Sequence, residues 1–474
     1  MTSDVEVQPS AEPSRPPTPS APRTWAALRP LLLRLHFYAG ILVAPFLFVA
    51  ATSGLLYAAS FQLERAVHAH ELTVPVQEDQ RADLPLSRQI AAARAAHPEG
   101  VVAAVRPAAE PGETTRVLLD VPGLAESTRL AVFVAPRTGE VRGALESYGS
   151  SAALPVRTWI SGLHRNLHLG EPGRLYSELA ASWLWVVALG GLVLWLSRRR
   201  RAGRRLRGVI APERGGSGLR RALSWHGSLG LWAVAGLLFL SATGLTWSKY
   251  AGGNVDVIQG ALGWSTPALS TSASTSASAS AGDHAAHSGD AHGSPDAAVV
   301  DVDRVAEAAA AGGLSGPLEI AWPAKPGGVY VVKEMDRLWP QRNDQVAVDP
   351  VGGQIVGELR FDDFPLVAKL IRWGIDGHMG VLFGLANQIL LAALAVGLMS
   401  VIVLGYRMWW LRRPTRGFGA PYERGSLRRL PWRLTLPLAV VVVAVGVFVP
   451  LLGISLLGFL VLDVVLGRIG AARR

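Results

Sequence analysis

The chain has 474 residues, half of them hydrophobic, and a mean hydropathy of +0.28. This balance excludes a single soluble globular domain and predicts a polytopic membrane protein with sizeable soluble parts. The net charge of +10 comes from arginines clustered beside apolar stretches, a pattern typical of membrane topology and not of a nucleic-acid-binding surface. The absence of cysteine excludes disulfides, thiolate-held iron–sulfur clusters and thiol catalysis, so any redox chemistry needs a bound cofactor.

The chain begins with a tail, residues 1–24, that is rich in Pro, Ser and Ala. We expect a disordered cytoplasmic tail and not a signal peptide. Residues 31–59 follow as the first predicted span, because a bilayer requires about 20 apolar residues. Arg23, Arg29 and Arg34 precede this span, so the positive-inside rule predicts a cytoplasmic amino terminus.

Residues 62–170 are predicted to form an extracytoplasmic module of α+β type. A helical pattern comes first, and three short alternating runs typical of strands follow it. The helix is expected over residues 86–96 and the strands over 101–106, 115–121 and 129–134. One helix and three antiparallel strands are enough for a small independent module.

Three further apolar stretches predict spans over residues 175–196, 223–247 and 385–406. Arginines crowd the segments 197–222 and 407–433. Under the positive-inside rule both segments are cytoplasmic loops.

The second outer segment, residues 248–383, resembles the first in sequence. Its residues 348–359 match residues 134–145, with Pro and Gly at the same positions. A low-complexity insert at 265–295 interrupts the segment and is typical of a flexible linker.

The final apolar stretch, residues 434–467, is broken by Gly446, Pro450 and Gly453. At about 1.5 Å per residue it is longer than one span needs and short for two. It predicts either a kinked helix or a hairpin, and we favour the hairpin.

Two spacings indicate that the chain is an internal duplication. His36 and Gly54 are separated by the same interval as His226 and Gly244, at an offset of 190 positions (226 − 36). The motif Trp-x4-His-x5-Gly occurs at 159–170 and again at 373–384, at an offset of 214 (378 − 164). Both halves start on the same side of the membrane, which predicts parallel repeats about an axis along the membrane normal.

This symmetry predicts that four histidines face one another in two pairs, His36 with His226 and His164 with His378. The first pair lies near the cytoplasmic ends of the first and third spans, and the second lies just before the second and fourth. The two facing imidazoles of each pair could bind one haem between them. Glycines four residues after His36 and His226 could leave room for a flat macrocycle. The alternative is that these are core or interfacial histidines with ordinary hydrogen-bond partners.

Other histidines are weaker candidates. His168 follows His164 by four residues and is a possible substitute ligand, although the second copy has Leu382 there. The insert contains His284, His287 and His292 beside aspartates, a possible metal-capturing tract or merely a polar spacer.

Common nucleotide-binding and hydrolase motifs are missing from the chain. It has no Walker A motif, HExxH motif or nucleophile elbow, and no dinucleotide-binding glycine motif in a strand–helix context. Any electron donor must therefore be a separate partner.

The segments LHRNLHLGEPGRLYSEL (163–179) and GHMGVLFGLANQIL (377–390) make the chain similar to the PepSY-associated transmembrane family. This resemblance covers residues 30–465. It implies an α-helical polytopic protein of the bacterial inner membrane, with four core spans as a tandem repeat, a C-terminal hairpin or kinked helix, and two small extracytoplasmic PepSY-like α+β modules. The family is iron-regulated and includes haem-containing ferric-siderophore reductases.

Carried over to this sequence, the resemblance assigns the haem-ligand positions to His36, His226, His164 and His378, with two b-type haems expected. The first functional hypothesis is a transmembrane electron conduit from a cytoplasmic donor to an extracytoplasmic ferric siderophore, embedded in membrane lipid and binding no nucleic acid. One alternative is a non-enzymatic, membrane-anchored PepSY protein with a binding or inhibitory role. Another is a metal transporter, which the absence of a midplane ionisable residue in the repeated spans disfavours.

Overall fold

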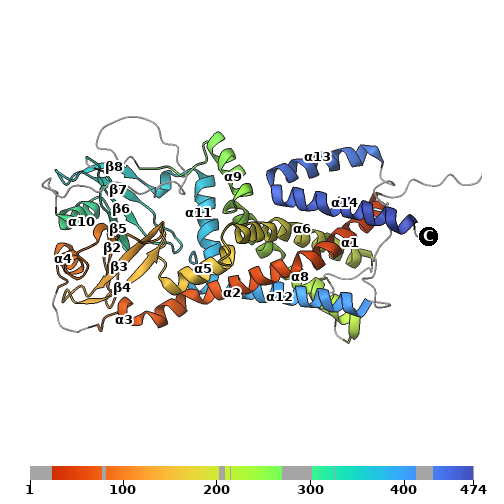
Figure 1. Ribbon diagram of the computed structural model, residues 1–474, viewed down its shortest axis with the longest axis horizontal. Helices are drawn as coiled ribbons and strands as arrows, with labels where there is room; N and C mark the ends of the chain where they lie inside the picture. The colour runs from red at the N-terminus through yellow and green to blue at the C-terminus, as the bar shows by residue number, and fades with distance from the viewer. Residues whose placement is uncertain are drawn as a thin grey trace, which may run out of the picture.

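The protein consists of a helical bundle with an antiparallel sheet at one end (Figure 1). The computed structural model describes residues 24–76, 82–201, 209–213, 215–269, 301–325, 327–412 and 431–472. Within these residues four helices are long and apolar enough to cross a membrane. The structure is therefore that of a polytopic membrane protein. Most of the predicted amino-terminal tail and of the low-complexity insert lies outside the described residues.

The four candidate membrane helices are α2 (Ala44–Val67), α6 (Glu171–Arg201), α8 (Gly218–Thr246) and α12 (Gly384–Arg412). A further helix, α1 (Thr24–Leu42), runs into α2 with a break at Val43. Pro45 explains this break, because its missing N–H and fixed φ suit the first turn of a new helix. The first predicted span is thus formed by two helices in succession.

The membrane helices extend beyond the apolar windows predicted from the sequence. Polar residues at the ends of these helices are also helical, whereas the hydropathy pattern identifies only the apolar part of each helix. In α2 the buried carboxylate of Glu64 accepts a hydrogen bond from the N–H of Leu154 at 3.0 Å and pairs with Arg157 at 3.4 Å. The end of α2 is therefore fixed by contacts with the segment around Leu154 and Arg157.

The sheet contains eight strands in the order β4-β3-β2-β1-β5-β6-β7-β8, all antiparallel to their neighbours. The first four are β1 (Val101–Arg106), β2 (Thr115–Asp120), β3 (Thr128–Val134) and β4 (Val141–Tyr148). The last four are β5 (Leu318–Ala321), β6 (Tyr330–Glu334), β7 (Gln345–Val348) and β8 (Ile355–Leu359).

This arrangement differs from the expected small module with three strands of its own. The three predicted strands form within one residue of their expected bounds, but β4 joins them. The two outer segments then share one sheet, because β1 pairs with β5 through Ala104 opposite Ala321 and Val105 opposite Ile320. The physical reason is that β1 would otherwise be an apolar edge strand with unpaired backbone groups.

The two faces of the sheet are covered differently. Helices α4 (Leu86–Ala96) and α10 (Val302–Ala311) cover one face, where Val305 packs with Val105, Ile320 and Val332 in one apolar core. The opposite face packs on the start of α5 through Leu154. The sheet is therefore attached to the bundle through α5 (Figure 1).

Short helices lie between the sheet and the membrane helices: α3 (Ala69–Leu72), α5 (Pro155–Asn166), α9 (Tyr250–Ala261), the 3-10 helix η1 (Phe361–Asp363) and α11 (Leu366–Met379). Helices α5 and α11 lead into α6 and α12. Each ends at a left-handed residue, Leu167 with φ 53° and Gly380 with φ 82°. These ends place His164 and His378 in the last turn of each helix.

The C-terminal stretch forms the helices α13 (Trp432–Phe448) and α14 (Pro450–Ala472), which fold back on each other as a hairpin (Figure 1). At the turn, a Cβ at Gly453 would lie 2.5 Å from the Gly446 carbonyl oxygen, so the close approach requires glycine. The Trp183 indole donates a hydrogen bond to the Ser455 hydroxyl at 2.9 Å. The hairpin therefore lies on the α6 side of the bundle.

Candidate functional site

The inner pair of histidines consists of His36 on α1 and His226 on α8. Their ring centres are 6.2 Å apart, and the ring planes are inclined at 80°. The residues are 190 positions apart in the sequence. We call two residues at matching positions of the two halves counterparts. They are 190 positions apart when they lie in the first and third spans, and 214 positions apart when they lie in the segments that follow those spans, up to the second and fourth spans.

The outer pair consists of His164 on α5 and His378 on α11. Their ring centres are 6.4 Å apart, with the planes inclined at 48°. This pair lies at the end of the bundle that faces the sheet, since α5 begins on the sheet itself. The structure thus brings together both histidine pairs on which the sequence analysis rests.

The two separations match a specific coordination geometry. An imidazole nitrogen binds a metal at about 2.0–2.1 Å and lies about 1.1 Å from its ring centre, so two imidazoles on opposite sides of one metal have centres about 6.3 Å apart. Both pairs fall close to this value. The ring separation in each pair is therefore the one that two imidazole ligands of a single metal would have.

Hydroxyl groups fix the tautomer of the outer pair. The Ser53 hydroxyl lies 3.0 Å from Nδ1 of His164, and the Thr243 hydroxyl lies 2.6 Å from Nδ1 of His378. Each hydroxyl also donates its proton to the backbone carbonyl four residues earlier, at 2.9 and 2.8 Å. With its proton on that carbonyl, the hydroxyl oxygen accepts the ring N–H, and in this tautomer Nε2 of each histidine has a free lone pair.

In the inner pair only His226 has a hydrogen bond at Nδ1. Nδ1 of His226 donates to the Val401 carbonyl at 2.9 Å, and a carbonyl can only accept, so Nε2 is again free to bind. Val187 is the counterpart of Val401 and lies beside His36. The Nδ1 atom of His36 is buried and has no hydrogen-bond partner among the described residues, so the Val187 carbonyl lies outside good hydrogen-bond geometry.

Each histidine ring also packs against a glycine from a neighbouring helix. A Cβ at Gly191 or Gly405, which are counterparts on α6 and α12, would lie 3.0 Å from Cε1 of His36 and 3.6 Å from Cε1 of His226. A Cβ at Gly54 or Gly244 would lie 3.2 and 3.8 Å from the outer histidines. The matched positions 191 and 405 were a signal available in the sequence that our reasoning missed.

Aromatic rings flank the outer pair. Tyr57 lies 6.4 Å from His164 with nearly parallel planes, and Trp247 lies 5.6 Å from His378 edge to face. Both follow the hydroxyl residue by four positions and are counterparts. Sequence reasoning used this segment only to align the halves, and so it overlooked a repeated unit of hydroxyl, glycine and aromatic residue around each outer histidine.

The two pairs occupy separate levels of the bundle. His226 precedes Gly244, which touches His378, by 18 positions (244 − 226) on the same helix. At about 1.5 Å per residue the levels are about 27 Å apart along α8. This separation is close to the thickness of the hydrocarbon core of a bilayer, about 30 Å.

A comparison with family models assigns the chain. The model described as PepSY-associated TM region matches residues 33–412, a range that contains all four paired histidines and both strand sets. The chain belongs to the PepSY-associated TM family. A comparison with curated proteins finds no match. The α13–α14 hairpin lies beyond the range that matches this PepSY-associated TM family.

Burial affects the outer histidines of this PepSY-associated TM protein. It lowers the pKa of His164, and it lowers the pKa of His378 to about 3, with a smaller effect from the neighbouring His164. Both rings are therefore neutral at pH 7, the state in which imidazole binds a metal.

Positive side chains gather between the outer pair and the sheet. Asp376, two residues before His378, is fully buried and lies 3.0 Å from Arg372 and 3.8 Å from Arg337. Burial and the nearby charge of Arg372 lower the pKa of Arg337 to about 10. Two guanidiniums thus share one carboxylate in this region, which leaves it electropositive.

The other predicted histidines are not part of either pair. Nε2 of His168 lies 2.9 Å from the Trp159 carbonyl, and the two rings stack at 5.2 Å. His284, His287 and His292 lie outside the described residues. Among the residues that are described, no group of three or more His, Asp or Glu side chains is placed to hold a metal ion.

Proposed function

We propose that this chain carries electrons across the bacterial inner membrane through two haems, one in each histidine pair, and reduces ferric iron outside the cytoplasm. The observation that carries the proposal is the pair of ring separations, 6.2 and 6.4 Å, at two levels of one bundle. One buried ligand site would serve storage or structure. Two stacked sites are what a conduit requires.

Each pair fits haem better than it fits a bare metal ion. A structural or catalytic zinc has three or four protein ligands, whereas each pair offers only two nitrogens and no further His, Asp or Glu ligand among the described residues. A metal held by two opposed imidazoles suits a macrocycle that supplies its other four ligands. A Cβ at Gly40 or Gly230, four residues after each inner histidine, would meet nothing within 4 Å, which leaves room beside that pair.

The chain's own residues then have defined tasks. His36, His226, His164 and His378 would hold the haems through Nε2, and Ser53, Thr243 and the Val401 carbonyl would orient the imidazoles through Nδ1. Bound haem would supply the one-electron transfer.

The direction of transfer follows from the proposed orientation. The arginine-rich segments 197–222 and 407–433 are assigned to the cytoplasm, so the inner pair receives electrons from a separate cytoplasmic donor. The outer pair and the sheet then face the extracytoplasmic side. The positive region at Arg337 and Arg372 suits an anionic acceptor such as a ferric siderophore, whose hard oxygen ligands hold iron more weakly after reduction.

The direct test is the visible spectrum and haem content of the full-length protein purified from haem-replete cells. We expect two b-type haems per chain, one after the change His36→Ala or His378→Ala, and none after both. The matched control His168→Ala should keep both haems, because its ring is bonded to the Trp159 carbonyl. A colourless wild-type protein would refute the proposal.

A second measurement tests the activity. Proteoliposomes with a trapped reductant should reduce an external ferric chelate only when the protein is loaded with haem. Iron uptake into such vesicles without any reductant would instead indicate a metal transporter.

A further inference from the structure

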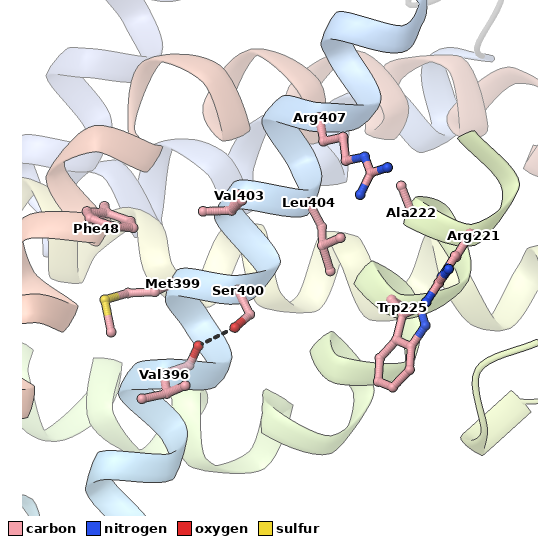
Figure 2. A pocket seen from close by; sticks show the side chains of 10 residues that line it. All are labelled: Phe48, Arg221, Ala222, Trp225, Val396, Met399, Ser400, Val403, Leu404 and Arg407. Carbon is pink, nitrogen blue, oxygen red and sulfur yellow. Dashed lines mark hydrogen bonds between the residues drawn. The ribbon is translucent and has the colours of Figure 1, made fainter. Parts of the chain in front are cut away.

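A groove on the side of the bundle is not used by the proposed electron path. It lies between α2, α8 and α12 and has a volume of about 620 Å³. Figure 2 shows the side chains that line it, with Arg407 pointing toward Ala222 at one end and Arg221 extending from α8 beside Trp225. Its remaining lining is mostly apolar, with Val396 and Met399 at the other end.

None of the four paired histidines lines this groove. Val396 and Val403 on α12 are 49% and 56% exposed, and Trp225 on α8 is 38% exposed. The opposite side of α12 carries Val401, whose carbonyl binds His226, and Gly405, which packs on that ring. In a membrane, the occupant of this groove therefore comes from the lipid phase.

The chain contains a second groove that acts as an internal comparison. It lies between α1 and α6, and seven of its residues are counterparts of residues in the first groove. Its volume is only about 190 Å³, and the α13–α14 hairpin lies on that side of the bundle. At the positions of Arg221 and Arg407 it has Leu31 and Val193. Both arginines are thus specific to the open groove.

These arginines have no acidic partner among the described residues. Both are exposed, whereas the neighbouring Arg220 is paired with Glu213 at 2.9 Å. Two unneutralised guanidiniums at the end of an apolar groove attract an anionic head group attached to a hydrocarbon chain.

The length of the groove agrees with such an occupant. Val396 and Arg407 are 11 positions apart on α12 (407 − 396), or about 16 Å at 1.5 Å per residue. Half of the hydrocarbon core of a bilayer is about 15 Å thick. An acyl chain from one leaflet would therefore cover the groove from the arginines to Val396.

We propose that this groove is a binding site for one anionic phospholipid, with its phosphate between Arg221 and Arg407 and an acyl chain along α12. The site does not depend on haem. It gives the protein a preference for anionic over zwitterionic lipid on the α12 side of the bundle.

Native mass spectrometry of the full-length protein, delipidated and then titrated with phosphatidylglycerol or phosphatidylcholine of the same acyl chains, tests the proposal. We expect wild type to retain one phosphatidylglycerol preferentially. The double change Arg221→Gln and Arg407→Gln should weaken this binding about 25-fold, since each arginine near a lipid surface contributes about 1 kcal/mol, or about fivefold. Arg220→Gln should have no effect.

Two further results would decide the matter. Val403→Trp fills the groove and should weaken binding of phosphatidylglycerol while keeping both arginines. Inorganic phosphate at millimolar concentration should not compete, because it lacks the acyl chain. Equal retention of the two lipids by wild type, or an unchanged preference in the double arginine variant, would overturn the proposal without affecting the haem hypothesis.

Discussion

The Thr243 hydroxyl lies 2.6 Å from Nδ1 of His378, just as its counterpart Ser53 lies 3.0 Å from Nδ1 of His164. This contact orients the imidazole and determines which nitrogen is free. It is the outer-shell interaction that most directly controls the outer site.

The change Thr243→Val keeps the shape of the side chain and removes the acceptor. We expect about 10–100-fold weaker haem binding at the outer site, the usual cost of losing a group that orients a histidine ligand. Titration of the haem-free protein with haem measures this loss. Thr52→Val is the matched control, because the Thr52 hydroxyl bonds to the Phe48 carbonyl and to Met399 and does not contact a histidine. Equal affinity of both variants would contradict the assigned role.

The counterparts Gly191 and Gly405 should respond differently to the same substitution. An alanine Cβ at 191 would lie 3.0 Å from the His36 ring and must displace it, whereas at 405 it would make an ordinary contact of 3.6 Å with His226. We expect Gly191→Ala to weaken haem binding at the inner site about tenfold, because ligand positions tolerate only about 0.5 Å of displacement. Gly405→Ala should be close to wild type, as should Gly397→Ala, where a Cβ meets nothing within 4 Å. Haem content after purification of the three variants provides the comparison.

The junction between the two strand sets predicts a pH dependence of stability. Burial by itself would raise the pKa of Glu319, but Arg106 and Lys333 on the neighbouring strands hold it at about 2, below its usual 4.5. A carboxylate with a lowered pKa stabilises the fold above pH 4.5, and this contribution is lost as the pH falls from 4.5 towards 2.

In that window the stability difference between wild type and Glu319→Gln should shrink by up to about 1.4 kcal/mol per pH unit. Thermal unfolding in detergent, followed by tryptophan fluorescence from pH 6 to pH 2.5, measures the difference. If the two proteins lose stability in parallel across this range, the ion pairs at the β1–β5 junction do not contribute as described.

Arg337 should control the charge preference of the acceptor site. Replacing it with Gln leaves Asp376 paired with Arg372 and hydrogen-bonded to Gln341, and it reduces the positive charge beside the outer pair. We expect the KM for an anionic ferric chelate to rise about fivefold at low salt and less at high salt, where screening weakens the field. The KM for a neutral chelate and the haem spectrum should not change. Arg342→Gln, a change at an exposed residue bonded to Ser315, is the control.

Sequence spacing was sufficient to group the four histidines, because a repeated interval in two apolar stretches is independent of local conformation. The strands β1, β2 and β3 were also predictable from their alternating pattern. The Ser53 and Thr243 contacts were not, because a hydroxyl residue in an apolar helix usually bonds to its own backbone, and only the structure shows that it also reaches a histidine.

The pairing of β1 with β5 could not be predicted from the sequence either. Only two pairs of residues, Ala104 with Ala321 and Val105 with Ile320, are paired between β1 and β5, which are more than 200 positions apart in the sequence. Nothing in either strand's own sequence specifies its partner. The need to pair an apolar edge was visible, but the choice among possible partners depends on how the membrane helices place the two segments.

The antiparallel contact between β1 and β5 has a consequence for the origin of such a chain. Each is the first strand of its own set of four, and antiparallel pairing of two equivalent edges is the self-complementary contact of a two-fold dimer. A protein of half this length could close the same sheet with a second copy of itself. His36 and His164 each face a histidine at the matching position of the following segment, so such a dimer would bring the same pairs together across its two-fold axis.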